Sequence, residues 1–113
     1  MERIIIVKEY KLKEEQIKRL VNYNGGCIAS DKITVDGKKI GYMYRENPTN
    51  EFDTGWRFFA GDEDEQYTDN PNNFEIYELN TICNYDQDVI PYLMKPVGTK
   101  LERNDKEFKE VTD

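Results

Sequence analysis

Histidine is absent from the 113-residue sequence, and cysteine occurs only at Cys27 and Cys83. The absence of histidine excludes the Ser-His-Asp and Cys-His nucleophile systems. Two cysteines without histidine cannot complete a four-ligand zinc site. We therefore expect a protein that is not an enzyme of a common kind, with no catalytic residues, no cofactor and no metal ion held by histidine or cysteine. The two cysteines are expected to act as buried apolar spacers.

Long apolar runs are also missing from the sequence. None approaches the ~18 residues that a membrane-spanning helix needs. The apolar run at residues 4–7 is too short for a signal peptide, and no small-residue cleavage site follows it. We therefore expect a cytoplasmic protein with no membrane partner and reduced thiols. The length is that of one domain, so residues 1–113 are predicted to form a single domain.

Basic residues are scarce in the middle of the chain. The whole sequence has 16 Lys and Arg against 23 Asp and Glu, a net charge of −7. Residues 46–94 contain twelve acidic residues and one basic residue, Arg57. Nucleic-acid binding needs a surplus of Lys and Arg for phosphate contacts, so we expect no nucleic-acid partner. The acidity either steers a basic protein partner or keeps the protein soluble, and both interpretations stay open.

The N-terminal region, residues 1–26, is predicted to contain a strand followed by the main helix. The β-branched run at residues 4–7 is typical of a strand. Over residues 12–24, apolar residues such as Ile17 and Leu20 follow the spacing of one helical face. Two acid–base pairs at i,i+4 support this helix, and two consecutive glycines after it supply a stop.

The rest of the chain is predicted to form strands that are joined as hairpins rather than as strand–helix–strand units. This pattern favours an α+β fold: a mostly antiparallel, curved sheet with one main N-terminal amphipathic helix packed on it. The predicted segments are strands at 27–30 and 55–61, a hairpin over 33–45 that turns at Asp36-Gly37, an extended stretch from 74 leading into a helical turn at 79–84, a helical turn at 89–93, and a final hairpin over 99–111.

The strand at residues 55–61 is rich in aromatic residues. Alternation places Trp56 and Phe58 on one face and Arg57 and Phe59 on the other, so one face is expected to point inward and one outward. Aromatic side chains of this kind are either core or interface residues. Arg57 stands among acidic neighbours, and we expect it to form a structural ion pair with an acid on the loop that follows its strand.

The acidic run at residues 62–65 is the densest charge cluster in the sequence. It fails the EF-hand test, because the sixth position is Tyr67 instead of glycine and the twelfth is Asn73 instead of glutamate. A weak divalent-cation site, a solvated loop and an electrostatic face for a basic partner stay open. The candidate partner-binding residues are Trp56, Asp62, Glu63, Asp64, Glu65, Tyr67 and Asp69.

Several short stretches carry a resemblance to a known family by their order and spacing. They are residues 29–38 (ASDKITVDGK), 41–45 (GYMYR), 55–63 (GWRFFAGDE), 70–74 (NPNNF), 79–82 (LNTI) and 88–93 (DVIPYL). Together they resemble the bacterial immunity protein 33 domain family, over roughly residues 27–111.

The resemblance implies a non-catalytic module that binds and neutralises a cognate bacterial toxin, and no catalytic residue set comes with the family. Together with the charge pattern, it points to a basic toxin as the partner. The alternative interpretation is a regulatory domain that binds a small molecule or a divalent cation. The sequence leaves the oligomeric state open.

Overall fold

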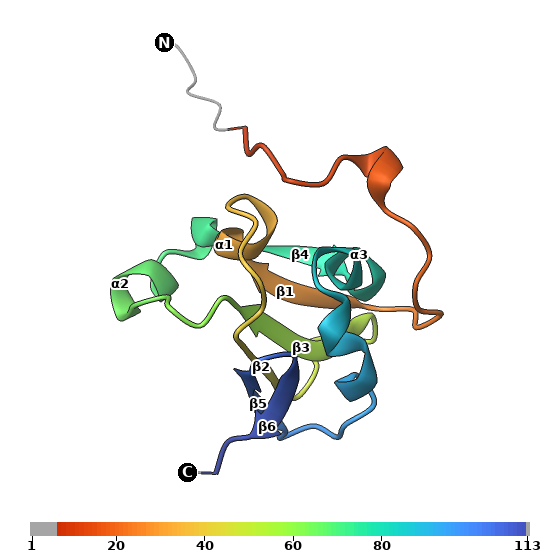
Figure 1. Cartoon of the computed structure of the whole chain (residues 1–113), viewed down its shortest axis with the longest axis vertical. Helices are drawn as coiled ribbons and strands as arrows, with labels where there is room; N and C mark the ends of the chain where they lie inside the picture. Colours follow the sequence, from red (N-terminus) through yellow and green to blue (C-terminus); the bar gives the residue numbers. More distant parts are fainter. Residues whose placement is uncertain (1–6, 113) are drawn as a thin grey trace.

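The computed structural model describes residues 7–112, and these form a six-stranded mixed sheet (Figure 1). The strands are β1 (Gly26–Ser30), β2 (Tyr42–Arg45), β3 (Asp53–Phe59), β4 (Phe74–Glu78), β5 (Lys100–Asn104) and β6 (Glu107–Glu110). Their order in the sheet is β4-β1-β3-β2-β5-β6. Within this sheet β1 and β3 run parallel, and the other neighbouring pairs are antiparallel. The predicted α+β class is confirmed.

Two short helical elements, α3 (Leu79–Tyr85) and η3 (Gln87–Tyr92), cover one face of the sheet. The core forms where Trp56 and Phe58 of β3 and Met43 of β2 pack against Ile82 and Cys83. All five of these side chains are fully buried, as expected for the inward positions of alternating strands. The helical elements are η1 (Glu14–Gln16), α1 (Asp31–Thr34), α2 (Glu65–Thr68), η2 (Pro71–Asn73), α3 (Leu79–Tyr85) and η3 (Gln87–Tyr92), where η marks a 3₁₀ turn.

The predicted main helix over residues 12–24 is wrong. Apart from η1, this segment is an extended arm that passes α3 on its outer side before the chain enters β1 (Figure 1). The Asn80 side chain holds the arm, because its Oδ1 accepts from the N–H groups of Leu20 and Val21 at 2.8 and 3.1 Å. Tertiary contacts thus replace the internal bonds of a helix. The strand predicted at residues 4–7 lies, except for Val7, outside the described residues.

The hairpin predicted around Asp36-Gly37 is also wrong. Ser30 caps α1, since its Oγ accepts from the N–H of Lys32 at 3.2 Å. Gly37 has a φ of 79°, and its N–H donates to the Ile33 carbonyl at 3.1 Å. The Asp-Gly pair therefore ends a short helix, as a left-handed glycine commonly does, instead of turning a hairpin.

The remaining predicted segments are confirmed. β1 and β3 match the strands expected at 27–30 and 55–61, although β3 begins earlier, at Asp53. The extended stretch from residue 74 is β4 and leads into α3, while the turn at 89–93 lies within η3 and its C-cap. β5 and β6 form the final hairpin, with Asp105 at a φ of 61° in its turn.

Candidate functional site

The sheet face opposite α3 carries a row of aromatic side chains. Tyr44 stacks on Phe59 at 5.8 Å between ring centroids, and Phe59 meets Phe74 edge to face at 5.7 Å. Tyr42 lies 6.0 Å from Phe59, and Tyr67 of α2 lies 5.9 Å from Phe74. We call these five residues the aromatic row. All five are half-buried, so their ring surfaces are partly open to solvent.

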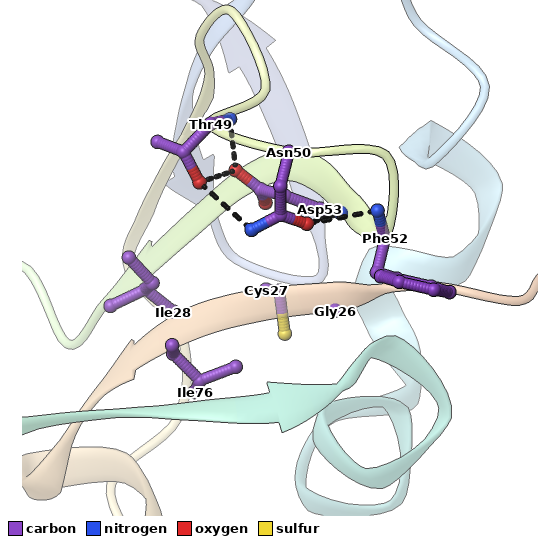
Figure 2. Close-up of a pocket in the computed structure, with 8 residues that line it drawn as sticks. All are labelled: Gly26, Cys27, Ile28, Thr49, Asn50, Phe52, Asp53 and Ile76. Atoms are coloured by element: carbon purple, nitrogen blue, oxygen red, sulfur yellow. Dashed lines mark hydrogen bonds between the residues drawn. The ribbon is translucent and has the colours of Figure 1, made fainter.

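A pocket of about 240 Å³ opens on the same face, beside the β1–β4 pair (Figure 2). Ile28 and Ile76 are cross-strand partners at its floor, and Phe52 borders it from the 49–53 loop. Phe52 is 74% exposed and Ile76 is 79% exposed. Neither residue was among the predicted partner-binding residues. The one indication in the sequence was that Phe52 is a lone apolar residue within the polar segment at 46–54.

The loop that carries Phe52 is held by its own side chains (Figure 2). The Asp53 carboxylate accepts from the N–H and the hydroxyl of Thr49 at 2.9 and 3.1 Å. Asn50 Oδ1 accepts from the N–H groups of Phe52 and Asp53 at 2.9 and 3.1 Å. The N–H of Gly26 in β1 donates to the Phe52 carbonyl at 2.7 Å. These bonds fix the loop to the sheet and hold Phe52 outward.

Arg57 is the cation of a cluster with two carboxylates, of which Asp53 is buried and Glu46 is half exposed. Its guanidinium donates to Asp53 Oδ2 at 2.7 Å and to Glu46 Oε2 at 2.6 Å. The hydrogen bonds from Arg57 hold the pKa of Asp53 well below its usual range, and the two carboxylates raise the pKa of Arg57. Both acids lie before Arg57 in the chain, whereas the sequence analysis expected an acid on the following loop. Two carboxylates against one guanidinium leave a charge of about −1.

Asp62 is the first carboxylate of the acidic loop, which we define as residues 62–69. It pairs with Lys32 at 3.2 Å and with Lys38 at 2.6 Å, and these bonds lower its pKa. The Lys32 ammonium also lies 5.0 Å from the centroid of the Tyr67 ring. Asp62 is therefore compensated by cations that come from the α1 region of the sequence.

The other four carboxylates of the acidic loop form no salt bridge in the part of the chain that the structure describes, although the charge of Glu63 acts on Lys38. Glu63 accepts from two backbone N–H groups, each at 2.8 Å. Asp64 caps α2 by accepting from a backbone N–H at 2.7 Å. The carboxylates of Glu65 and Asp69 are exposed and make no hydrogen bond or ion pair within residues 7–112. Negative charge therefore concentrates here.

Ion pairing explains why the acidic loop stands out from the rest of residues 46–94. Seven of the twelve acidic residues in this segment are in ion pairs, namely Glu46, Asp53, Asp62, Glu75, Glu78, Asp86 and Asp88. The other five are Glu51 and the four carboxylates of the acidic loop. The sequence could not show this division, because most of the pairing cations come from outside the segment.

Trp56 does not belong to the exposed face. Its side chain is fully buried, and its Nε1 donates to the Leu93 carbonyl at 3.0 Å. Trp56 is a core residue, which corrects its prediction as a partner-binding residue. Phe59, on the opposite side of the same strand, points to the open face instead.

Several other site types lack support in residues 7–112. No group of three or more Cys, Asp or Glu side chains converges there to hold a metal ion. None of the helices there has the length and apolar character to cross a bilayer. Both thiols are buried, and burial raises the pKa of Cys27 and raises that of Cys83 to about 11.

A comparison with protein-family models matches residues 27–112 to the immunity protein Imm33 domain. The match begins in β1 and takes in all six strands of the sheet. The chain therefore belongs to the Imm33 immunity protein domain family, as its sequence resemblance implied. Comparisons with curated proteins and with solved structures give no match. The family points to an immunity-type role.

Proposed function

We propose that this protein binds and neutralises a cognate bacterial toxin, without catalysing a reaction, through the open face of its sheet. The observation that carries the proposal is a juxtaposition on that face. Four carboxylates of the acidic loop that form no salt bridge within residues 7–112 lie beside the half-buried rings of the aromatic row. Membership of the Imm33 family supports the same role.

The two features of the face supply different parts of a binding reaction. Carboxylates that are not neutralised within the protein attract a basic partner and raise its association rate by about 10–10³-fold in favourable fields. Aromatic rings supply contact area, and such residues are enriched among those that dominate binding energy. The proposed partner is therefore a basic toxin protein.

A hollow of about 220 Å³ joins the two features. Tyr42 and Phe59 line one side of it, and Glu63 and Thr68 line the other. The Glu63 carboxylate is fixed there by its two backbone hydrogen bonds. A lysine or arginine of the toxin that entered this hollow would meet both an anion and aromatic faces, which is a favourable cation environment.

The alternative, a small-molecule or divalent-cation site, has less support. Small-molecule sites commonly enclose about 300–1,000 Å³, and the pocket beside β4 encloses about 240 Å³. A hollow of about 430 Å³ lies next to it between Tyr23 and Phe52, but it is more open to solvent and so encloses a ligand less. The acidic loop uses Asp62, Glu63 and Asp64 in ion pairs and backbone contacts rather than pointing them at a shared centre.

The test uses the double variant Glu65→Gln with Asp69→Asn, because neither carboxylate holds the local structure. The cognate toxin is sought among the products of the neighbouring genes, and its association with the protein is followed at low and high salt. We expect the variant to associate several-fold more slowly at low salt and like the wild type at high salt. The matched control is Asp105→Asn with Glu107→Gln in the β5–β6 hairpin, which removes the same charge elsewhere.

A variant that associates at the wild-type rate at both salt concentrations would contradict the electrostatic part of the proposal. A toxin that neither binds the protein nor loses toxicity in its presence would contradict the proposal as a whole. Substituting Asp62 and Asp64 as well would be a poorer test, since Asp62 pairs with two lysines and Asp64 caps α2.

A further inference from the structure

We infer that the pocket beside β4 receives one apolar side chain of the toxin, flanked in the toxin sequence by lysine or arginine. We call it the Phe52 pocket, after the residue that borders it from the 49–53 loop (Figure 2). This inference rests on the proposed function and adds to it the chemistry of one contact.

The exposure of the residues around the pocket is the first observation. Phe52 and Ile76 are about three-quarters exposed and line the same pocket, together with Ile28, the cross-strand partner of Ile76. Phe74 and Ile76 also border a shallower hollow next to it on β4. Adjacent exposed apolar residues of this kind mark interaction surfaces, whereas single ones are ordinary.

The rigidity of the loop is the second observation. Asn50 and Asp53 bind the backbone of the loop, and Gly26 ties it to β1. Phe52 is therefore already held outward in the free protein. Binding a partner then requires little ordering of this loop, and preorganisation of this kind favours affinity.

The polar side chains that line the pocket already have hydrogen-bond partners within the protein, and this favours an apolar occupant. The side chains of Thr49, Asn50 and Asp53 hydrogen bond with one another, with the loop backbone or with Arg57 (Figure 2). An apolar occupant leaves none of these groups without a partner, so it incurs little desolvation cost. The pocket volume of about 240 Å³ is below that of typical small-molecule sites, which matches a single side chain.

The charge of the 49–53 loop selects the kind of partner. Asp53 lines the pocket, and the cluster that it forms with Glu46 and Arg57 carries one more negative than positive charge. Glu51, on the same loop, forms no salt bridge among residues 7–112. A basic segment complements this loop. A second copy of the chain does not, because a two-fold contact would bring the same negative charges together.

The first experiment uses three tripeptide probes and the full chain, with methyl and amide NMR spectra as the readout. The probes are N-acetylated, C-amidated Lys-Phe-Lys, Lys-Ala-Lys and Glu-Phe-Glu. We expect Lys-Phe-Lys at millimolar concentration to shift the signals of Ile28, Ile76 and Phe52. We expect the other two to bind at least about tenfold more weakly, since one carries no apolar side chain and the other carries the wrong charge.

The second experiment measures affinity for the toxin with Phe52→Ser and, separately, Ile76→Thr. The matched control is Met94→Ser, because Met94 is 74% exposed like Phe52 but lies outside the pocket. We expect each pocket variant to lose at least about tenfold in affinity and the control to lose less than about twofold. Because these side chains are exposed, the melting temperatures should stay close to that of the wild type.

Four results would overturn the inference. If Lys-Ala-Lys binds as well as Lys-Phe-Lys, the pocket does not select an apolar side chain. Pocket variants that bind the toxin like the Met94 variant leave the proposed function standing and remove the pocket from the interface. If the NMR signal of the Ile76 methyl group shifts when the protein alone is diluted, the occupant of the pocket is a second copy of the chain. If that signal shifts when residues 1–6 are deleted, the occupant is this segment of the same chain.

Discussion

Replacing Arg57 with methionine is expected to lower the free energy of unfolding by about 3 kcal/mol at pH 7. Methionine keeps an unbranched apolar stem but removes the cation. The Arg57 side chain is 4% exposed and that of Asp53 is 9% exposed. The variant therefore leaves a buried carboxylate without its partner, and breaking a buried ion pair in this way typically costs about 3–5 kcal/mol.

We expect the cost of Arg57→Met to lie at the low end of this range because neither carboxylate is left without a hydrogen-bond partner. Asp53 still accepts from the N–H groups of Thr49 and Gly55, each at 2.9 Å. Glu46 is 50% exposed, so water replaces its lost partner. For the same reason the control variant Glu46→Gln should cost less than about 1 kcal/mol.

The effect should also depend on pH. Arg57 holds the pKa of Asp53 below that of the unfolded chain. A carboxyl group of this kind contributes stability above its unfolded pKa and loses it as the pH falls through its folded pKa. The methionine variant lacks this contribution. The difference in unfolding free energy between wild type and variant is therefore largest above about pH 4 and shrinks below it.

Urea unfolding followed by tryptophan fluorescence measures this difference. Trp56 is the only tryptophan in the sequence and is fully buried, so its emission reports the loss of the core. A shift of about 3 kcal/mol corresponds to about 12 °C in melting temperature for a domain of this size. The reasoning is refuted if Arg57→Met unfolds with the wild type at pH 7, or if the difference grows toward acid pH.

Two further predictions concern the arm and the thiols. Asn80→Ala leaves the N–H groups of Leu20 and Val21 without their acceptor, at a cost of about 2 kcal/mol. Hydrogen exchange of those two amides should accelerate while the sheet stays protected; unchanged exchange would show that apolar packing alone holds the arm. Cys27 and Cys83 should react with a disulfide reagent at about pH 8 only as fast as the protein unfolds, since both thiols are buried with raised pKa values. A cysteine that reacts faster than the native protein unfolds would contradict this prediction.

The strands were predictable because their signal is local. β1 carries the short apolar stretch Cys27-Ile28-Ala29 and β3 is rich in aromatic residues, and these features are the same whichever strand lies next to them. They did not reveal that β1 and β3 are parallel neighbours, because the partner of a strand depends on the whole sheet. The hairpin of β5 and β6 was accessible since its two strands are adjacent in sequence.

The arm was not predictable from its own residues. Residues 12–24 satisfy the helical spacing and carry favourable charge pairs, yet helix propensity is a weak preference and isolated helices of this length are marginal. Asn80 and Asn84 lie some sixty positions further along and bind the backbone of the arm at Lys18, Leu20 and Val21. These contacts hold Val21 against the core in an extended conformation.

The candidate site was only partly accessible for a similar reason. The acidic run was visible in the sequence, but the neutralisation of Asp62 depends on Lys32 and Lys38, which the fold brings to it. Alternation placed Trp56 and Phe59 on opposite faces and could not say which face α3 would cover. The prediction of Trp56 as a partner-binding residue is wrong for this reason, because Trp56 lies on the covered face and Phe59 on the open face.

On the open face, the groups expected to set the association rate of the proposed complex lie apart from those expected to set its lifetime. Four of the five carboxylates in residues 46–94 that form no salt bridge with a described residue lie on α2 and the residues around it, and the fifth is Glu51. The exposed apolar residues Phe52 and Ile76 lie on the 49–53 loop and on β4. Charges act over about a Debye length and mainly set the association rate. Apolar contacts act only once they are made, so they mainly set the lifetime. Because no contact joins Glu65 to Phe52 within residues 7–112, their effects on affinity should add.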